Sequence, residues 1–217
     1  FQAEDGIRDC LLSRGLGDVY KRQHMKIAIT GTTGLAAAIA GALQDHTIST
    51  PRVEDITMNG IHWWGFDYNN SNHVDVLINH AHRGFRQTEI LMHTYDAWKN
   101  DSSKYIINIS SRASQPNISK GYMYATQKAS LNFLTDNLVY NSDKQCRITT
   151  INLGLLNHDD LPSLTHEEVA NAVKYLIDLP QHIEIPEMTL QNSANYQEVQ
   201  SDKEAIKEAE WLAQKQS

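Results

Sequence analysis

The stretch KIAITGTTGLAAAIAGAL, residues 26–43, decides the fold. Residues 26–30 are a short run rich in Ile and ending in Thr, which is typical of a buried β-strand. Residues 35–43 are rich in Ala and Leu, which favours a helix. A strand that passes through a glycine turn into a helix predicts an α/β fold, with the turn at the positive N-terminal end of the helix dipole.

The turn between this strand and this helix predicts a site for a dinucleotide, because backbone N–H groups at a helix N-terminus bind a pyrophosphate. The first glycine permits the tight turn, and the second lets the backbone approach the phosphate. An alanine stands where such turns carry a third glycine, so a plain strand–helix turn is the alternative. The residues expected to bind the cofactor here are Gly31, Thr32, Thr33, Gly34 and Leu35.

Strand-length apolar runs alternate with helical patterns along the rest of the chain. This alternation, with nearly continuous apolar strands, predicts a parallel sheet covered by helices on both faces. Thr165 and Glu168 form a capping-box pattern at the start of one helix. The expected strands are 26–30, 46–50, 61–66, 74–78, 104–110, 146–152 and 183–190, and the expected helices are 35–43, 85–99, 122–140, 165–179 and 203–214.

Composition excludes several classes of protein. The chain of 217 residues has 19 Lys and Arg against 26 Asp and Glu, a net charge of −7, which argues against a general nucleic-acid binder. No apolar run reaches the roughly 18 residues of a membrane-spanning helix, so no membrane partner is expected. Two cysteines, Cys10 and Cys146, cannot form a disulfide framework, and we expect a reducing, cytoplasmic setting.

Residues 1–24 show neither helical nor strand periodicity, and Met25 then opens the first strand. The segment resembles a translated adapter or vector sequence, and a disordered N-terminal tail is the alternative. It holds four basic and four acidic residues, so the net charge belongs to residues 25–217. We expect residues 25–217 to form a single domain and residues 1–24 to lie outside it.

A second set of residues carries acid–base chemistry. Ser111 ends the expected strand 104–110, Tyr124 follows 13 residues later, and Lys128 lies four residues after Tyr124. Residues i and i+4 share one face of a helix, so the tyrosine and the lysine stand side by side. An ammonium beside a phenol favours the phenolate and lowers its pKa, as a general acid–base near neutral pH requires. Taken alone, such a pair is more often a half-buried tyrosine and a solvated lysine.

These motifs together resemble the short-chain dehydrogenase/reductase family. The resemblance implies a Rossmann-type, doubly wound parallel sheet in three α/β/α layers, and an NAD(P)-dependent oxidoreductase. It also implies that Ser111, Tyr124 and Lys128 are the catalytic serine, tyrosine and lysine. The matching stretches are ITGTTGLA (29–36), DVLINHAH (75–82), YIINISS (105–111), YATQK (124–128) and INLGLL (151–156).

The resemblance adds further cofactor-binding candidates. Asn79 and Ala81 match the family's Asn-Asn-Ala-Gly stretch, in which histidines replace the second Asn and the Gly. Asp67 stands where the family has an aspartate near the adenine, and Gly154 and Leu156 stand in the segment beside the nicotinamide. The family's relay asparagine has no counterpart, and two intervals between strands are shorter than usual.

The cofactor and partners can also be stated as expectations. NAD-selective sites place an acidic residue about 20 residues after the glycine turn. Here Pro51 fills that position and Arg52 follows, so we expect NADP(H) to be favoured over NAD(H). The substrate is expected to be a small carbonyl or alcohol, and no metal site is expected because His80 and His82 lack further ligands.

The family also implies association. We expect a homodimer or homotetramer through the apolar faces of helices 85–99 and 122–140, which carry Tyr95, Trp98, Phe133 and Leu134. The main alternative function is an NAD(P)-binding sensor or scaffold that turns over weakly or not at all. An extended-family epimerase is a further alternative, against which the short C-terminal region argues.

Overall fold

The computed structural model describes residues 24–51, 62–63, 66–67, 74–116, 121–141 and 143–194, together with Glu208 and Trp211. The prediction for residues 1–23 and most of the expected helix 203–214 lie outside these residues. His24, which the prediction assigned to the segment outside the fold, hydrogen-bonds to Asp45 O at 2.8 Å and to Thr47 Oγ1 at 2.7 Å. These contacts involve a single residue, and the predicted domain boundary stays a prediction.

Six parallel strands form the central sheet, in the order β2-β1-β5-β6-β7-β8. The direction of winding reverses between β1 and β5, so the carboxyl ends of these two strands form the topological switch point, where α/β proteins bind ligands. The predicted doubly wound parallel sheet is confirmed. The strands are β1 (Lys26–Ile29), β2 (Thr47–Ser49), β5 (Val76–Asn79), β6 (Tyr105–Ser111), β7 (Arg147–Leu153) and β8 (Glu187–Leu190).

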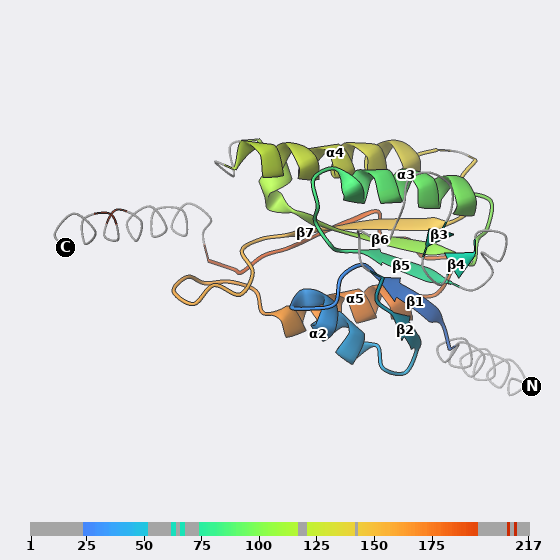
Figure 1. Ribbon diagram of the computed structural model, residues 1–217, viewed down its shortest axis with the longest axis horizontal. Coiled ribbons are helices and arrows are strands. Elements are labelled where there is room, and N and C mark those ends of the chain that lie inside the picture. The colour runs from blue at the N-terminus through green and yellow to red at the C-terminus, as the bar shows by residue number, and fades with distance from the viewer. Residues whose placement is uncertain are drawn as a thin grey trace, which may run out of the picture.

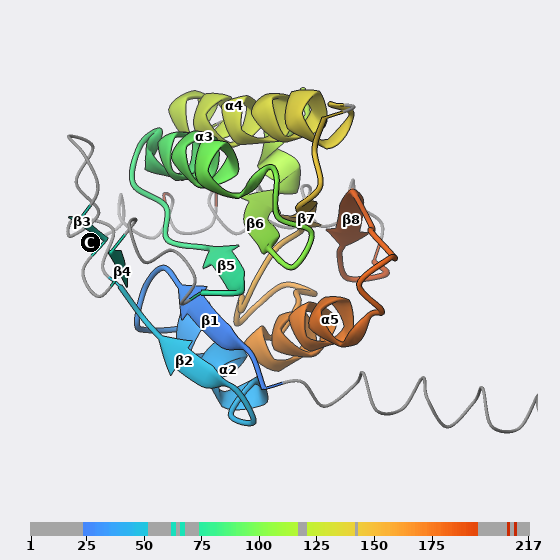
Figure 2. The ribbon, with the colours of Figure 1, turned by 90° about the vertical axis from the view of Figure 1, so that its right-hand side faces the viewer.

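Helices cover both faces of this sheet (Figures 1 and 2). One face carries α2 (Leu35–Ala42) and α5 (His166–Asp178), and the other carries α3 (Arg86–Trp98) and α4 (Tyr122–Val139). A short 3₁₀ helix, η4 (Arg112–Ser114), connects β6 toward α4. The capping box of α5 is confirmed, with both hydrogen bonds present.

The alternation of side chains along each strand builds one apolar core on each face. In β1, Ile27 and Ile29 pack toward α2 and α5, whereas Ala28 packs toward α3 and α4. In β6, Ile107 and Ile106 divide in the same way. Because the four central strands, β1, β5, β6 and β7, are buried along nearly all of their length, they read as continuous apolar runs, which is why the sequence indicated a parallel sheet.

Two strand predictions are wrong in detail. Residues 61–66 were expected as one strand, but His62–Trp63 (β3) and Phe66–Asp67 (β4) pair as an antiparallel hairpin outside the main sheet. Gly65 lies between them in the sequence, and glycine is a common residue of hairpin turns. The last strand begins at Glu187 rather than at residue 183, directly after Pro186, which has no N–H to donate to a ladder.

The surface expected for association is also corrected. Tyr95 and Trp98 lie in the core beneath α3, 5% and 8% exposed, so they offer no outer face. Leu134 also packs against that core, while Phe133 is exposed on α4. An apolar face that repeats at the helical period of 3.6 residues can pack against the sheet of its own chain or against a second chain. Here most of that face packs against the sheet.

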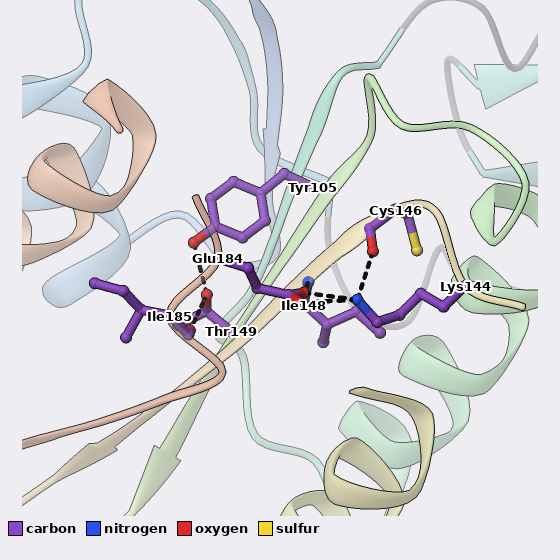
Figure 3. A network of polar contacts seen from close by, with 7 residues as sticks. All are labelled: Tyr105, Lys144, Cys146, Ile148, Thr149, Glu184 and Ile185. Atoms are coloured by element: carbon purple, nitrogen blue, oxygen red, sulfur yellow. Dashed lines mark hydrogen bonds and ion pairs between the residues drawn. The ribbon is translucent and has the colours of Figure 1, made fainter. Parts of the chain in front are cut away.

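A network of polar contacts holds the amino ends of β6 and β7 against the segment that leads into β8 (Figure 3). Lys144 Nζ lies 2.8 Å from Glu184 Oε1 and donates to Cys146 O at 3.0 Å, and Ile148 N donates to the same Glu184 oxygen at 2.7 Å. We call the residues labelled in Figure 3 the amino-edge network. Cys146 itself is fully buried, as a small apolar residue would be. Of the helices described, none is long and apolar enough to span a membrane.

Candidate active site

The glycine turn after β1 has the backbone that a phosphate-binding turn needs. Gly31 has φ 101° and Gly34 has φ 56°, values that only glycine adopts readily. Gly34 is also the N-cap of α2, and no side chain caps the first turn of this helix. Thr32 and Thr33 are exposed beside it, while the Leu35 side chain is buried in the core.

The loop after β5 lies directly against this turn. Thr30 Oγ1 accepts hydrogen bonds from His80 N at 2.8 Å and Ala81 N at 2.9 Å. A Cβ placed on Gly31 would lie 3.4 Å from His80 Nδ1 and 3.5 Å from Ala81 Cβ, which are ordinary contact distances, so the positive φ of Gly31 rather than crowding explains the glycine. The structure therefore brings the turn and Ala81 together at the switch point between β1 and β5.

His80 is held in one orientation, because its Nδ1 donates to Thr30 O at 3.2 Å. Burial lowers the pKa of His80, and the positive charges of Lys128 and His166 lower it further against the opposing effect of the Thr30 carbonyl. The imidazole is thus favoured in its neutral form, with Nδ1 protonated.

Asn79 is fully buried at the end of β5 and ties neighbouring elements together. Its Nδ2 donates to Gln87 O at 2.8 Å and to Asn108 Oδ1 at 3.0 Å. Its Oδ1 has no hydrogen-bond partner among the described residues. These contacts account for the asparagine structurally, and its role in cofactor binding stays a prediction.

Lys128 lies on α4 and is 3% exposed, an unusual burial for a lysine. Its Nζ donates to Gln87 Oε1 at 2.6 Å and to Ile109 O at 2.9 Å. Within the part of the chain that the structure describes, the ion pairs all involve other cations. Burial accordingly lowers the pKa of Lys128 to about 7.

Tyr124 stands beside Lys128, as the helical spacing predicted. The lysine Nζ lies 5.8 Å from the centre of the Tyr124 ring. The ring of His82 also meets the tyrosine ring edge-on, with 4.9 Å between ring centres. His82 Nε2 donates to Gln127 Oε1 at 2.8 Å, and burial together with the charge of Lys128 lowers the His82 pKa.

Ser111 ends β6 and caps the 3₁₀ helix η4, which packs against α4. Its hydroxyl accepts a hydrogen bond from Ala113 N at 3.1 Å and donates a long one, 3.4 Å, to Leu153 O. The serine hydroxyl is therefore partly engaged by the backbone. These two contacts explain a serine at position 111 by structure alone, independently of any reaction.

Gly154 and Leu156 follow β7 at the same edge of the sheet. A Cβ on Gly154 would lie 3.0 Å from Gln191 Cβ and 3.2 Å from Gln191 Cα, so tight packing against the end of β8 explains this glycine. Leu156 pairs with Leu164 in an isolated parallel bridge and packs against the core. Neither contact tests the proximity to a nicotinamide that the family resemblance implied.

Two candidates for the adenosine side lie outside what the structure describes. Arg52 is not among the described residues, and only the backbone of Asp67, in β4, is described. In the described chain, no group of three or more His, Cys, Asp or Glu side chains is placed to hold a metal ion.

Sequence reasoning missed three residues at this edge of the sheet. Thr30 joins the glycine turn to the loop after β5, and Gln87 contacts Lys128 from the neighbouring helix. His166, the first residue of α5, lies beside Gly34, since a Cβ there would be 3.6 Å from His166 Cε1. Thr30 lies within the glycine-turn stretch 29–36, but that stretch gives no sign of its contact with the loop after β5, and no local pattern marks the contacts of Gln87 or His166, because each acts across a large separation in the sequence.

Comparison with known proteins gives a likeness in structure but none in sequence. No family model matches the chain, and no curated protein matches it. Serine dehydrogenase from Escherichia coli superposes with a TM-score of 0.58 at 18% identity, over 79% of this chain and 99% of that one. An alcohol dehydrogenase from the archaeon Thermococcus sibiricus, complexed with 5-hydroxy-NADP, gives 0.60 at 16%, over 80% and 98%.

A short chain dehydrogenase from Burkholderia cenocepacia J2315, in complex with NADP, gives a TM-score of 0.59 at 15% identity, over 87% of this chain and 96% of that one. The fold is that of the short-chain dehydrogenases. At these identities the likeness establishes the fold, and the activity has to be argued from the residues of this chain.

Proposed function

We propose that the chain is an NAD(P)-dependent oxidoreductase that transfers hydride between NADPH and a small carbonyl or alcohol. The observation that carries the proposal is the buried Lys128 ammonium beside Tyr124 at the carboxyl edge of the sheet. A buried lysine without a carboxylate partner is costly to stability, and such groups concentrate at functional sites.

The residues present fit a dinucleotide. The positive-φ glycine turn and the uncapped N-terminus of α2 would hold its diphosphate. An ammonium has three N–H donors, of which Lys128 uses two on Gln87 and Ile109, so one is left for a ribose hydroxyl. When bound, the nicotinamide supplies the hydride.

Each proposed catalytic residue has a separate task. Tyr124 supplies a proton to the oxygen on which negative charge develops, and Ser111 donates a hydrogen bond to the same oxygen. Lys128 has one N–H donor left, with which it would hold a ribose hydroxyl of the cofactor beside the tyrosine. His82, in ring contact with Tyr124, would take up a proton from solvent and pass it to the tyrosine in place of the missing relay asparagine.

The test is to add NADPH and a panel of small carbonyl compounds to the purified chain and to follow the loss of NADPH absorbance. Turnover that falls by roughly 10²–10³ in Ser111→Ala supports the role of the serine as a hydrogen-bond donor. Turnover unchanged in this variant contradicts that role.

A sensor or scaffold without turnover is the second candidate, and the engagement of Ser111 by Ala113 N and Leu153 O favours it. A hydroxyl that caps a 3₁₀ helix has less freedom to bind a substrate oxygen. Tight NADPH binding with no reduction of any carbonyl in the panel would support this candidate over the enzyme.

The finer points of the proposal have their own tests. A preference for NADP(H) predicts that Arg52→Ala weakens NADPH binding more than NADH binding, and equal losses contradict it. A homodimer or homotetramer through the outer faces of α3 and α4, where Met92 and Phe133 are exposed, predicts a multiple of the chain mass in sedimentation. A cytoplasmic location stays an expectation from the cysteine content.

A further inference from the structure

Lys128 is hydrogen-bonded to a side chain that belongs to none of the sequence motifs described above. Gln87, on α3, accepts a hydrogen bond from the lysine Nζ at 2.6 Å, and both side chains are almost completely buried. The second acceptor is Ile109 O, in β6. The ammonium is therefore fixed at the junction of α3, α4 and β6.

The amide of Gln87 can adopt only one orientation in this place. Its Nε2 donates to Asn79 O at 2.8 Å, to Ile109 O at 3.0 Å and to His80 O at 3.3 Å. Carbonyl oxygens only accept hydrogen bonds, so the NH₂ group must face them. The carbonyl oxygen of the amide must then face the ammonium, because a flipped amide would set donor against donor and acceptor against acceptor.

The charge around Lys128 is as informative as the hydrogen bonds. Among the residues that the structure describes, the titratable groups that face it are Tyr124 on its own helix, and His80 and His82 in the loop after β5. None of these is a carboxylate. The strongest acceptor of the ammonium is thus the neutral oxygen of Gln87, which holds its position without neutralising its charge.

We propose that Gln87 is a positioning residue for Lys128, whose carboxamide orients the ammonium at the carboxyl edge of the sheet and keeps it free of a counter-charge. The catalytic meaning of this role rests on the proposed reductase function, but the contact can be tested without turnover. The low pKa of Lys128, about 7, agrees with an acceptor that carries no charge.

The test is a pH titration of the full-length chain, labelled with ¹³C at the lysine Cε and followed by NMR. The Lys128 signal is the one that disappears in Lys128→Met. In Gln87→Glu, a carboxylate replaces the neutral acceptor, and we expect the proton affinity of Lys128 to rise at least tenfold, about one pH unit or more. In Gln87→Met, which keeps the volume and removes the acceptor, we expect the affinity to fall.

Asn108→Asp is the matched control. Asn108 is a fully buried amide in the same polar cluster, bonded to Asn79 and Thr135 but not to Lys128. We expect its effect on the Lys128 midpoint to be less than half that of Gln87→Glu. Circular dichroism and melting curves identify variants that fold, and Gln87→Met decides the question if Gln87→Glu does not fold.

An unchanged midpoint in the folded Gln87 variants overturns the proposal, as does an equal shift in Asn108→Asp. If the midpoint moves as expected but the native chain reduces no carbonyl, Gln87 still positions Lys128 and only the reductase function fails. If the native chain is active, Gln87→Glu should also move the alkaline limb of the kcat/KM profile, where the ammonium is lost, to higher pH. If the native chain is active but the pH midpoint of Lys128 is unchanged in the Gln87 variants, the reductase function is supported and the positioning role of Gln87 is rejected.

Discussion

The two ends of the sheet hold their buried lysines in different ways. At the amino edge, Lys144 is paired with Glu184 at 2.8 Å, so its charge is neutralised where it lies (Figure 3). At the carboxyl edge, the contacts of Lys128 with described residues are to two neutral oxygens, and none of these residues supplies a carboxylate to compensate its charge. The first arrangement serves stability, and the second carries an electrostatic cost that an anionic ligand, or the loss of a proton from the ammonium, would relieve.

Tyr124→Phe tests the carboxyl edge with the largest expected effect. The change removes the phenolic hydroxyl from a ring that is already 38% exposed, so the free energy of unfolding should barely change. Turnover of any carbonyl found to be a substrate should fall by roughly 10²–10⁴, the usual contribution of a general acid. Steady-state kinetics and NADPH binding measure this, and a wild-type rate in the variant would remove the tyrosine from the mechanism.

Lys144→Met tests the amino edge and should have the opposite profile. It leaves Glu184 without its ammonium partner, which should lower the free energy of unfolding by about 1–3 kcal/mol while kcat stays unchanged. Lys174→Met is the matched control, because its pair with Asp178 is exposed on α5 and should contribute less than about 0.5 kcal/mol. Urea unfolding of both variants measures the difference, and equal effects would refute the special weight given to the amino edge.

The pH dependence of stability sharpens the contrast between the two lysines. The pKa of Lys128 is about 7 in the folded chain and about 10.4 in an unfolded one, so the unfolded state binds more protons between these values. The free energy of unfolding should therefore rise with pH above 7, by up to about 1.4 kcal/mol per unit, and this slope should vanish below 7.

This slope is isolated by subtracting the Lys128→Met chain, measured at the same pH values. The native chain should gain about 1–3 kcal/mol relative to the variant between pH 7 and pH 9. If the difference in the free energy of unfolding between the two chains stays constant over this interval, burial does not lower the pKa of Lys128. The corresponding subtraction for Lys144→Met serves as the comparison within the same molecule.

Tyr105→Phe has the smallest expected effect. The Tyr105 hydroxyl lies 2.6 Å from Thr149 Oγ1 at the amino edge, and Thr149 Oγ1 also donates to Ile185 O at 2.6 Å. The threonine keeps its bond to the carbonyl in the variant, so the loss should be about 0.5–1.5 kcal/mol. Thermal melting of the variant checks this, and a loss several times larger would mean that the network acts as a unit.

What the sequence predicts well here is local. The β-strands follow from apolar runs, and the contact between Tyr124 and Lys128 follows from the helical period, since both signals lie within a few residues. The hairpin at 62–67 was mistaken for one strand because a short apolar run carries no signal of its direction.

The contact between Gln87 and Lys128 was beyond such reasoning. The two residues are 41 positions apart, and a glutamine among the first residues of a helix is ordinary in a sequence. Only the packing of α3 beside α4 brings them together. The engagement of Ser111 by Ala113 N was equally hidden, because one serine satisfies both a cap and a catalytic motif.

The buried thiol of Cys146 at the amino edge can be used to measure how fast this part of the fold opens to solvent. Cys146 has no exposed surface, and burial raises its pKa to about 11, so in the closed molecule it is neither reachable nor ionised. In a Cys10→Ser chain, the rate at which a thiol reagent modifies Cys146 therefore reports how often this edge opens to solvent. The same measurement with and without NADPH would show whether NADPH binding at the carboxyl edge changes the opening rate at the amino edge.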